Sequence, residues 1–176
     1  GFTASSYRNI IGANDRVRVG VVGFSDRHRN DHIPAFLASN KELNFDIIAV
    51  SDIWKKKREA GKDFLTQKMG HAIQACVNNE ELYNIKEVDA VIISTADFQH
   101  AWHTVEAVRA GRDTYTEKPL AETMEDARAV LKAVKESGKI VQIGSQRRSG
   151  GNYKAAADFI KEGKFGPIVM VELTWN

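Results

Sequence analysis

A glycine turn near the start of the sequence has the residue types that a phosphate site needs. The valine-rich run Val17–Val22 leads directly into Gly23 and a polar stretch. This pattern predicts a buried strand, a tight turn and the start of a helix. The free N–H groups and the dipole of such a helix start attract anions, so we expect Gly23, Phe24 and Ser25 to lie against a phosphate. The Arg27 guanidinium can pair with the same group.

The turn matches a dinucleotide-binding fingerprint in part. Gly23 stands at the first glycine of the G-x-G-x-x-G pattern, while Ser25 and His28 occupy the other two glycine positions. A side chain at position 25 crowds the approach of a pyrophosphate, and one at position 28 separates the helix from the strand. The fingerprint alone leaves two interpretations open, a nucleotide site and a strand–turn–helix unit that binds nothing.

A carboxylate follows the turn at the spacing at which dinucleotide-binding proteins hold a ribose. Asp52 comes directly after the predicted strand Phe45–Ser51, close to the ~20 residues expected. We expect Asp52 to accept hydrogen bonds from the ribose hydroxyls, which favours NAD, although NADP stays possible. The alternatives are a helix N-cap role for Asp52 and a grip on a 2′-phosphate by the basic run Lys55–Arg58, which more simply forms a solvated helix face.

Lys118 has the residue type and the position of a proton-transfer group. It lies between Glu117 and Pro119 and follows the predicted strand Asp113–Thr116. A lysine in a partly dry cleft can pass a proton near neutral pH. This matters because removing a hydride from a carbon requires the proton of its hydroxyl to leave as well. We therefore predict Lys118 as the catalytic residue, with a plain surface lysine as the alternative.

Apolar runs alternate with helical patterns along the chain, and this alternation predicts the fold. Six strands with helices between them indicate an α/β fold of the Rossmann type, a doubly wound parallel sheet. The expected strands are 17–22, 45–51, 71–77, 88–94, 113–116 and 140–143. The helix that Thr123 caps should bury an apolar face made of Met124, Ala127, Leu131 and Val134.

Ligands of such sheets bind outside the carboxyl ends of the strands. Side chains at further strand ends and helix starts therefore join the predicted cofactor site. They are Thr95, Ala96, His100, Glu117, Lys118 and Gln146. His100 has a helix cap or a buried hydrogen-bonding role as its alternative, and we interpret His103 as structural.

The chain divides into three predicted segments. Residues 1–15 form an N-terminal tail, 16–145 an NAD(P)-binding domain, and 146–176 the beginning of an incomplete α+β domain for substrate binding and oligomerisation. The last segment has a helix, Tyr153–Lys161, and a strand, Pro167–Asn176, whose apolar residues alternate onto one face. Such a strand needs partners and a covering layer. We therefore expect these residues to be part of a longer protein.

Composition argues against several other classes of protein. The 176 residues are 43% hydrophobic and 27% charged with a net charge of +2, which is too neutral to favour a nucleic-acid partner. Cys76 is the only cysteine, and the five histidines lack the spacing of metal ligands, so we predict no disulfide and no metal site. No apolar run approaches the ~20 residues of a membrane span, so we expect no membrane partner.

Several of these motifs together resemble one family of oxidoreductases. Glu117-Lys118-Pro119, preceded by a strand and by Ala110-Gly111-Arg112, resembles the signature of the Gfo/Idh/MocA family, the glucose–fructose oxidoreductases and inositol dehydrogenases. The resemblance extends over residues 16–176. The other stretches that agree with it are Val19–Gly23, the strand end at Asp52, Ser94–Asp97 with His100, and Val141–Ser149.

The resemblance implies a function and a set of roles. It implies NAD or NADP in the first domain, a sugar or cyclitol substrate, and a hydrogen bond from Lys118 to the hydroxyl that undergoes hydride transfer. It also implies a Lys118–Pro119 bond that is often cis and a homo-oligomer when full length. We expect Glu117 to lie near the nicotinamide ribose, with a plain solvated carboxylate as the alternative. Ser25, His28 and Ala96 depart from the family pattern, and the first two put tight cofactor binding in question.

Two other functions stay open beside hydride transfer to or from a sugar. One is the cleavage of glycosides by a family member that keeps its NAD bound, and the other is a nucleotide-binding module without catalysis. The N-terminal tail resembles the segment that follows a twin-arginine export signal. It therefore indicates export to the periplasm, with a cytoplasmic location as the alternative.

Overall fold

The computed structural model describes residues 16–172 and 174 of the chain. Two compact units meet in the sequence between Gly144 and Ser145. The first unit contains a six-stranded sheet with its helices. The second contains a short 3₁₀ helix, η3 (Gln146–Ser149), and the helix α7 (Gly151–Lys161).

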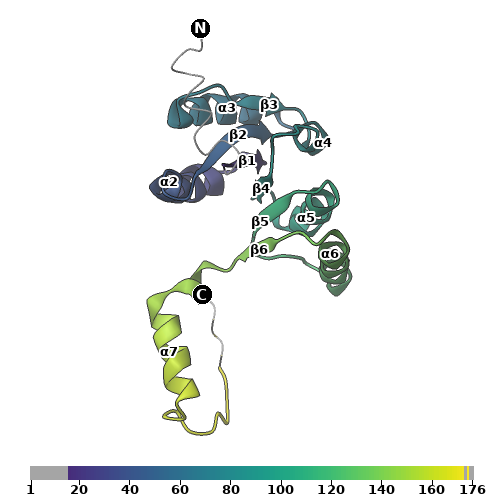
Figure 1. The fold of residues 1–176 in the computed structure, drawn as a ribbon. Coiled ribbons are helices and arrows are strands. Elements are labelled where there is room, and N and C mark those ends of the chain that lie inside the picture. The colour runs from purple at the N-terminus through teal and green to yellow at the C-terminus, as the bar shows by residue number, and fades with distance from the viewer. Residues whose placement is uncertain (1–15, 173, 175–176) are drawn as a thin grey trace. The chain divides into compact units, whose positions relative to one another are not determined.

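All six strands run parallel, in the order β3-β2-β1-β4-β5-β6. This is the strand order of the Rossmann fold, in which the chain winds outward in both directions from the centre of the sheet. The predicted doubly wound parallel sheet is confirmed (Figure 1). The strands are β1 (Val17–Val22), β2 (Phe45–Ser51), β3 (Gln74–Cys76), β4 (Ala90–Ile93), β5 (Asp113–Glu117) and β6 (Val141–Gly144).

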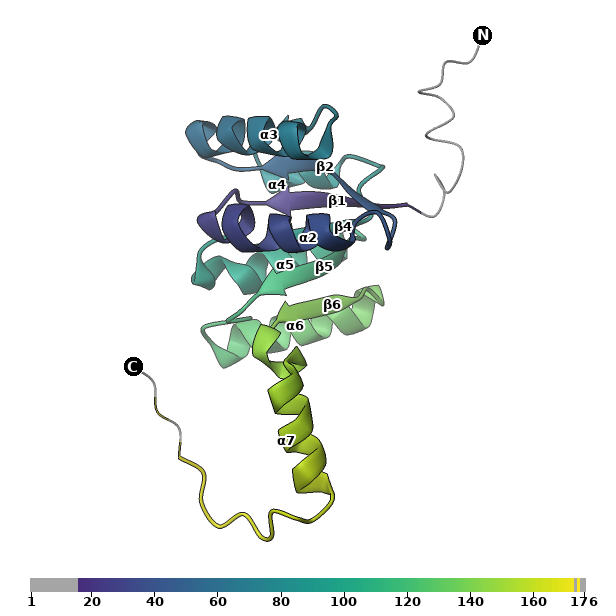
Figure 2. The ribbon, with the colours of Figure 1, turned by 90° about the vertical axis from the view of Figure 1, so that its left-hand side faces the viewer.

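Helices cover both faces of the sheet. One face carries α2 and α3, and the other carries α4, α5 and α6 (Figures 1 and 2). A π-helix, η1, comes directly before α2, and a 3₁₀ helix, η2, directly before α5. The bounds are η1 (His28–His32), α2 (Ile33–Ser39), α3 (Lys55–Met69), α4 (Asn79–Tyr83), η2 (Asp97–Gln99), α5 (His100–Arg109) and α6 (Met124–Ser137).

Each face of the sheet has its own apolar core, which explains the valine run of β1. Val21 packs with Ile33 of α2 and Leu65 of α3, whereas Val22 packs on the opposite face with Leu82 of α4. All of these side chains are fully buried. Successive side chains of a strand alternate between its faces, so a strand covered on both sides must be apolar throughout. Burying one such side chain stabilises the fold by about 1.5–3 kcal/mol.

The predicted apolar face of α6 is only partly right. Met124 and Leu131 are 69% and 55% exposed, whereas Val130 and Ala133 are buried. Ala127 and Val134 are half-buried, and they lie on the same side as Val130 at helical spacing. The helix therefore presents a stripe rotated by about one residue from the predicted one. Two neighbouring apolar stripes have the same period, so the period alone does not choose between them.

The predicted strand Pro167–Asn176 is wrong over the residues that the structure describes. Residues 167–172 and 174 have no strand conformation. Val169 and Val171 are 92% and 73% exposed. A strand requires a neighbour to accept and donate its backbone hydrogen bonds, and no described segment pairs with this one. Leu173, Trp175 and Asn176 lie outside the described residues.

Candidate cofactor-binding and catalytic site

The turn after β1 can be made only by glycine. Gly23 has φ +74°, a backbone conformation that residues with a side chain rarely adopt. A Cβ atom at Gly23 would lie 2.6 Å from the Thr95 side chain at the end of β4. The Gly23 N–H donates to the Ser51 carbonyl at the end of β2, at 2.8 Å. The turn therefore joins the carboxyl ends of three neighbouring strands.

The two residues in place of glycines are built into the turn. The Ser25 hydroxyl accepts the His28 backbone N–H at 3.2 Å and lies 3.0 Å from the Ser94 hydroxyl. The His28 side chain is fully buried, with Nε2 at 3.4 Å from the Val22 carbonyl. His28 is also the first residue of the π-helical turn η1. Burial and the neighbouring His32 lower the pKa of His28 to about 3, so the ring is neutral at pH 7.

Asp52 ties the glycine turn to the end of β2. Its Oδ2 accepts the Phe24 backbone N–H at 3.0 Å, and its Oδ1 accepts that of Trp54 at 2.8 Å. Trp54, not Asp52, is the N-cap residue of α3. Each carboxylate oxygen can accept more than one hydrogen bond, so Asp52 keeps acceptor capacity for a ligand hydroxyl.

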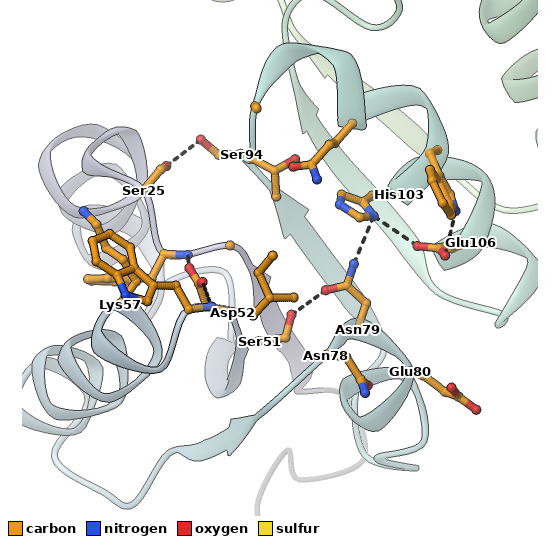
Figure 3. Close-up of a pocket in the computed structure, with 18 residues that line it drawn as sticks. Ser25, Ser51, Asp52, Lys57, Asn78, Asn79, Glu80, Ser94, His103 and Glu106 are labelled. Atoms are coloured by element: carbon orange, nitrogen blue, oxygen red, sulfur yellow. Dashed lines mark hydrogen bonds and ion pairs between the residues drawn. The ribbon is translucent and has the colours of Figure 1, made fainter.

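A cavity of about 690 Å³ opens above these strand ends (Figure 3). This volume is typical of pockets that bind small molecules. Six of the predicted cofactor residues line it: Gly23, Phe24, Ser25, Asp52, Thr95 and Ala96. Thr95 Oγ1 is buried and has no hydrogen-bond partner among the described residues, so it can bond to a polar ligand. A turn without Cβ, an acceptor carboxylate and this hydroxyl together fit a dinucleotide.

The far wall of the cavity is a polar cluster that the sequence analysis missed. The Ser51 hydroxyl donates to Asn79 Oδ1 at 2.7 Å, and Asn79 Nδ2 lies 3.0 Å from His103 Nδ1. His103 Nδ1 also lies 3.0 Å from Glu106 Oε2 (Figure 3). His103, interpreted above as structural, therefore lines the pocket. The signal was present, because Gln99, His103 and Glu106 recur at the spacing of one helix face.

The remaining predicted site residues of the first unit do not line this cavity. Arg27 Nη1 pairs with Asp31 at 3.0 Å, and its Nε and Nη2 donate to Glu117 Oε1, each at 3.2 Å. His100 is buried, with Nδ1 at 2.7 Å from the Pro119 carbonyl. Arg27 is thus committed to protein carboxylates rather than turned toward the pocket.

The Glu117-Lys118-Pro119 motif lies at the carboxyl end of β5. Glu117 is buried and Lys118 is exposed, and the Lys118–Pro119 peptide bond is cis, as the resemblance implied. Burial raises the pKa of Glu117, but the hydrogen bond from His32 and the charge of Arg27 outweigh that effect, so the pKa falls below its usual value. Gln146 belongs to the second unit, where it begins η3.

The described residues contain neither a metal-binding cluster nor a helix that could span a membrane. No group of three or more His, Cys, Asp or Glu side chains there is placed to hold a metal ion. Among the same residues, no helix combines the length and the apolar character that a membrane crossing requires.

The strand order, the glycine turn and the cavity at the strand ends define an NAD-binding Rossmann domain. Residues 17–145 match the family model described as "Oxidoreductase family, NAD-binding Rossmann fold". The chain therefore belongs to the Gfo/Idh/MocA family, as the motifs indicated.

Curated relatives carry the names of sugar and cyclitol enzymes. The chain is 33% identical over 150 residues to 1,5-anhydro-D-fructose reductase of Ensifer adhaerens. The aligned residues cover 85% of this chain and 42% of the relative. It is 32% identical over 158 residues to inositol 2-dehydrogenase of Salmonella typhimurium. The aligned residues cover 88% of this chain and 43% of the relative. The chain thus spans less than half the length of these relatives.

Solved structures show the same fold. The WlbA dehydrogenase of Bordetella pertussis, crystallised with NADH and UDP-GlcNAcA, has a TM-score of 0.73 at 24% identity, covering 86% of this chain and 43% of that one. A 3-ketoreductase from Actinomadura kijaniata, crystallised with NADP and TDP-benzene, has a TM-score of 0.69 at 23% identity, covering 84% and 43%.

Proposed function

We propose that this chain is the cofactor-binding part of an NAD-dependent oxidoreductase that acts on a hydroxyl group of a sugar or cyclitol. The carrying observation is the placement of the cavity around Gly23 and Asp52 and of the exposed Lys118 at carboxyl ends of strands of one parallel sheet. The names of the curated relatives, an anhydrofructose reductase and an inositol dehydrogenase, support the substrate class.

Different cavity residues contact different parts of the cofactor. Gly23 and Ser25, at the helix start, face the pyrophosphate, because the positive end of the helix dipole and the absence of a Cβ at Gly23 favour a phosphate there. Asp52 accepts the adenosine ribose hydroxyls, which favours NAD because a 2′-phosphate would meet a carboxylate. Lys57, the cation of the basic run that lines the cavity, is already paired with Asp26 at 3.2 Å. That pairing weakens the case for NADP.

Lys118 is the group that handles the substrate proton. The nicotinamide, when bound, supplies the acceptor or donor for hydride. Lys118 hydrogen-bonds the substrate hydroxyl and holds its proton as the carbon–hydrogen bond breaks. The buried carboxylate of Glu117 precedes it and Pro119 follows it, so the backbone around Lys118 is anchored on both sides.

Binding and turnover of the full-length protein test this proposal. Calorimetry should give a lower Kd for NAD than for NADP. With NAD and a panel of sugars and cyclitols, the absorbance of reduced nicotinamide should rise for at least one substrate. Binding of NAD without net reduction, together with release of the aglycone from glycosides, would instead favour the glycoside-cleaving function. Binding without either reaction would leave a nucleotide-binding module.

A further inference from the structure

A second histidine connects the glycine turn to the Glu117-Lys118-Pro119 motif. His28 and His32 begin and end the π-helix η1, and their Nδ1 atoms lie 3.1 Å apart. His32 Nε2 lies 2.7 Å from Glu117 Oε1 on β5. A chain of contacts therefore runs from the Val22 carbonyl through both imidazole rings to Glu117. All of it lies within the first unit, and neither histidine nor Glu117 lines the cavity.

The buried carboxylate of Glu117 has several hydrogen-bond donors at one of its oxygens. The side chain is 5% exposed, and a buried carboxylate is costly unless cations and donors surround it. Oε1 receives Nε and Nη2 of Arg27 as well as the contact from His32. A Cβ at Gly144, the neighbour on β6, would lie 3.1 Å from the same oxygen, so glycine leaves the space that the carboxylate fills.

The hydrogen-bond partners of His28 and His32 indicate which ring nitrogens carry hydrogen. The Val22 carbonyl only accepts, so His28 Nε2 carries the hydrogen of that contact. His28 is neutral, which leaves its Nδ1 as an acceptor, and the hydrogen between the two Nδ1 atoms must come from His32. The opposite arrangement would set the Nε2 lone pair of a fully buried His28 against the Val22 carbonyl oxygen.

The other ring nitrogen of His32 must also donate. Its partner Glu117 Oε1 already accepts two N–H groups of Arg27, which favours an ionised carboxylate at that oxygen. Both His32 nitrogens then carry hydrogen, and the ring is a cation.

The charges around His32 agree with this assignment. The groups in printed contact with its ring are His28 from its own helical segment and Tyr115 and Glu117 from β5, while Arg27 and Asp31 of the same segment pair with each other. Arg27 pairs with both Asp31 and Glu117, so a charged His32 brings these four groups to two positive and two negative charges. Tyr115 presents its ring to the His32 ring edge-on, with centroids 5.6 Å apart.

We propose that His32 is a positioning residue: an imidazolium, fixed in orientation by His28, that holds Glu117 as an ionised carboxylate directly before the catalytic lysine. The role toward Lys118 rests on the proposed function, whereas the protonation of His32 does not. The dinucleotide fingerprint has a glycine at the position of His28, where it allows close packing of the helix on the strand. In this chain the position holds a histidine instead, and that histidine orients His32.

Nitrogen NMR of the full-length protein with isotope-labelled histidine tests the protonation directly. At neutral pH, His32 should show two protonated ring nitrogens and His28 one. The Glu117→Gln variant keeps the side-chain volume and removes the charge, so His32 should lose one proton. His71→Gln is the matched control, because His71 Nε2 also pairs with a carboxylate, that of Asp46 at 2.9 Å, but on the surface. A single protonated nitrogen on His32 in the unmodified protein would overturn the proposal.

Two further measurements test the positioning. In chemical denaturation, His32→Gln and Glu117→Gln should each lower the midpoint, and the double variant should lower it by less than the sum. In kinetics, His32→Gln should lower kcat about tenfold, the size of one hydrogen bond to a charged group, and leave the Kd of NAD nearly unchanged. Additive midpoints or an unchanged kcat would overturn the positioning role. Full activity of Lys118→Ala would contradict the proposed function alone, and the NMR result would stand.

Discussion

His100 Nδ1 lies 2.7 Å from the carbonyl oxygen of Pro119, so the first residue of α5 holds the loop that follows β5. The other ring nitrogen, Nε2, lies 3.2 Å from the carbonyl of Thr95, at the end of β4. His100 therefore contacts two loops at the carboxyl edge of the sheet: one lines the cavity, and the other carries the Glu117-Lys118-Pro119 motif.

Replacing His100 should loosen both loops. His100→Ala removes the ring that contacts both carbonyl oxygens, and a lost hydrogen bond of this kind costs about 0.5–1.5 kcal/mol. We expect a lower free energy of unfolding and a weaker affinity for NAD, because Thr95 lines the cavity. Chemical denaturation and calorimetry measure the two effects. His71→Ala, which removes a surface histidine, should change neither, and equal effects of both variants would contradict the bridging role.

Asp52 should matter for binding through two separable contributions. Asp52→Ala removes the ribose acceptor and also releases the Phe24 and Trp54 N–H groups, so NAD binding should weaken by roughly 1–3 kcal/mol. Asp52→Asn keeps one acceptor oxygen for the backbone and should weaken NAD less while improving the relative affinity for NADP. Calorimetry with both nucleotides checks this, and unchanged NAD affinity in Asp52→Ala would remove Asp52 from the site.

The glycine turn can be tested by a pair of substitutions. Gly23→Ala forces a side chain into a φ of +74°, which costs about 1–2 kcal/mol, and sets its Cβ 2.6 Å from the Thr95 methyl group. Thr95→Ser removes that methyl group and keeps the hydroxyl. The double variant should therefore recover part of the stability lost in Gly23→Ala, but not all of it. Full recovery in denaturation would show that the backbone conformation carries no cost.

Local sequence patterns predicted the strands and the glycine turn well, for a physical reason. β-branched runs between turn residues indicate strands wherever both faces are buried, as in β1 and β2. The turn was predictable because Gly23 is dictated by its own backbone and by Thr95. The face of α6 was not predictable to one residue, since Leu131 and Val130 offer equally apolar stripes.

Contacts between side chains that are far apart in the sequence were not predicted. Arg27 was expected at a phosphate, yet Glu117, 90 positions away in the chain, accepts its hydrogen bonds. No local pattern encodes such a pair, because it depends on β5 lying where the sheet places it. The π-helical turn η1, which contains the buried His28, was likewise not predicted from the sequence.

Acid should destabilise the first unit through His28. Its pKa is about 3 in the folded state and 6.5 without burial, so the unfolded chain binds the proton first. The free energy of unfolding should therefore fall as the pH drops below about 6.5, by a few kcal/mol in total by pH 3. The lowered pKa of Glu117 adds a loss of the same sign, beginning near its ordinary value of 4.5. His28→Gln should flatten the upper part of this slope, and an unchanged slope would show that another group dominates.

Substitution of Lys118 tests the catalytic assignment in the full-length protein. If Lys118 holds the substrate hydroxyl and its proton, Lys118→Ala should lower kcat by about 10²–10⁴-fold, the usual effect of losing an acid–base group. The affinity for NAD should change little, since Lys118 does not line the cavity around Gly23 and Asp52. Lys118→Arg should rescue poorly, because a guanidinium keeps its charge but does not give up its proton. Single-turnover reduction of NAD with the responding sugar or cyclitol measures the chemical step, and Lys135→Ala, on the exposed side of α6, is the matched control. Unchanged turnover in Lys118→Ala would refute the assignment, whereas a loss in both lysine variants would point to a general effect of charge.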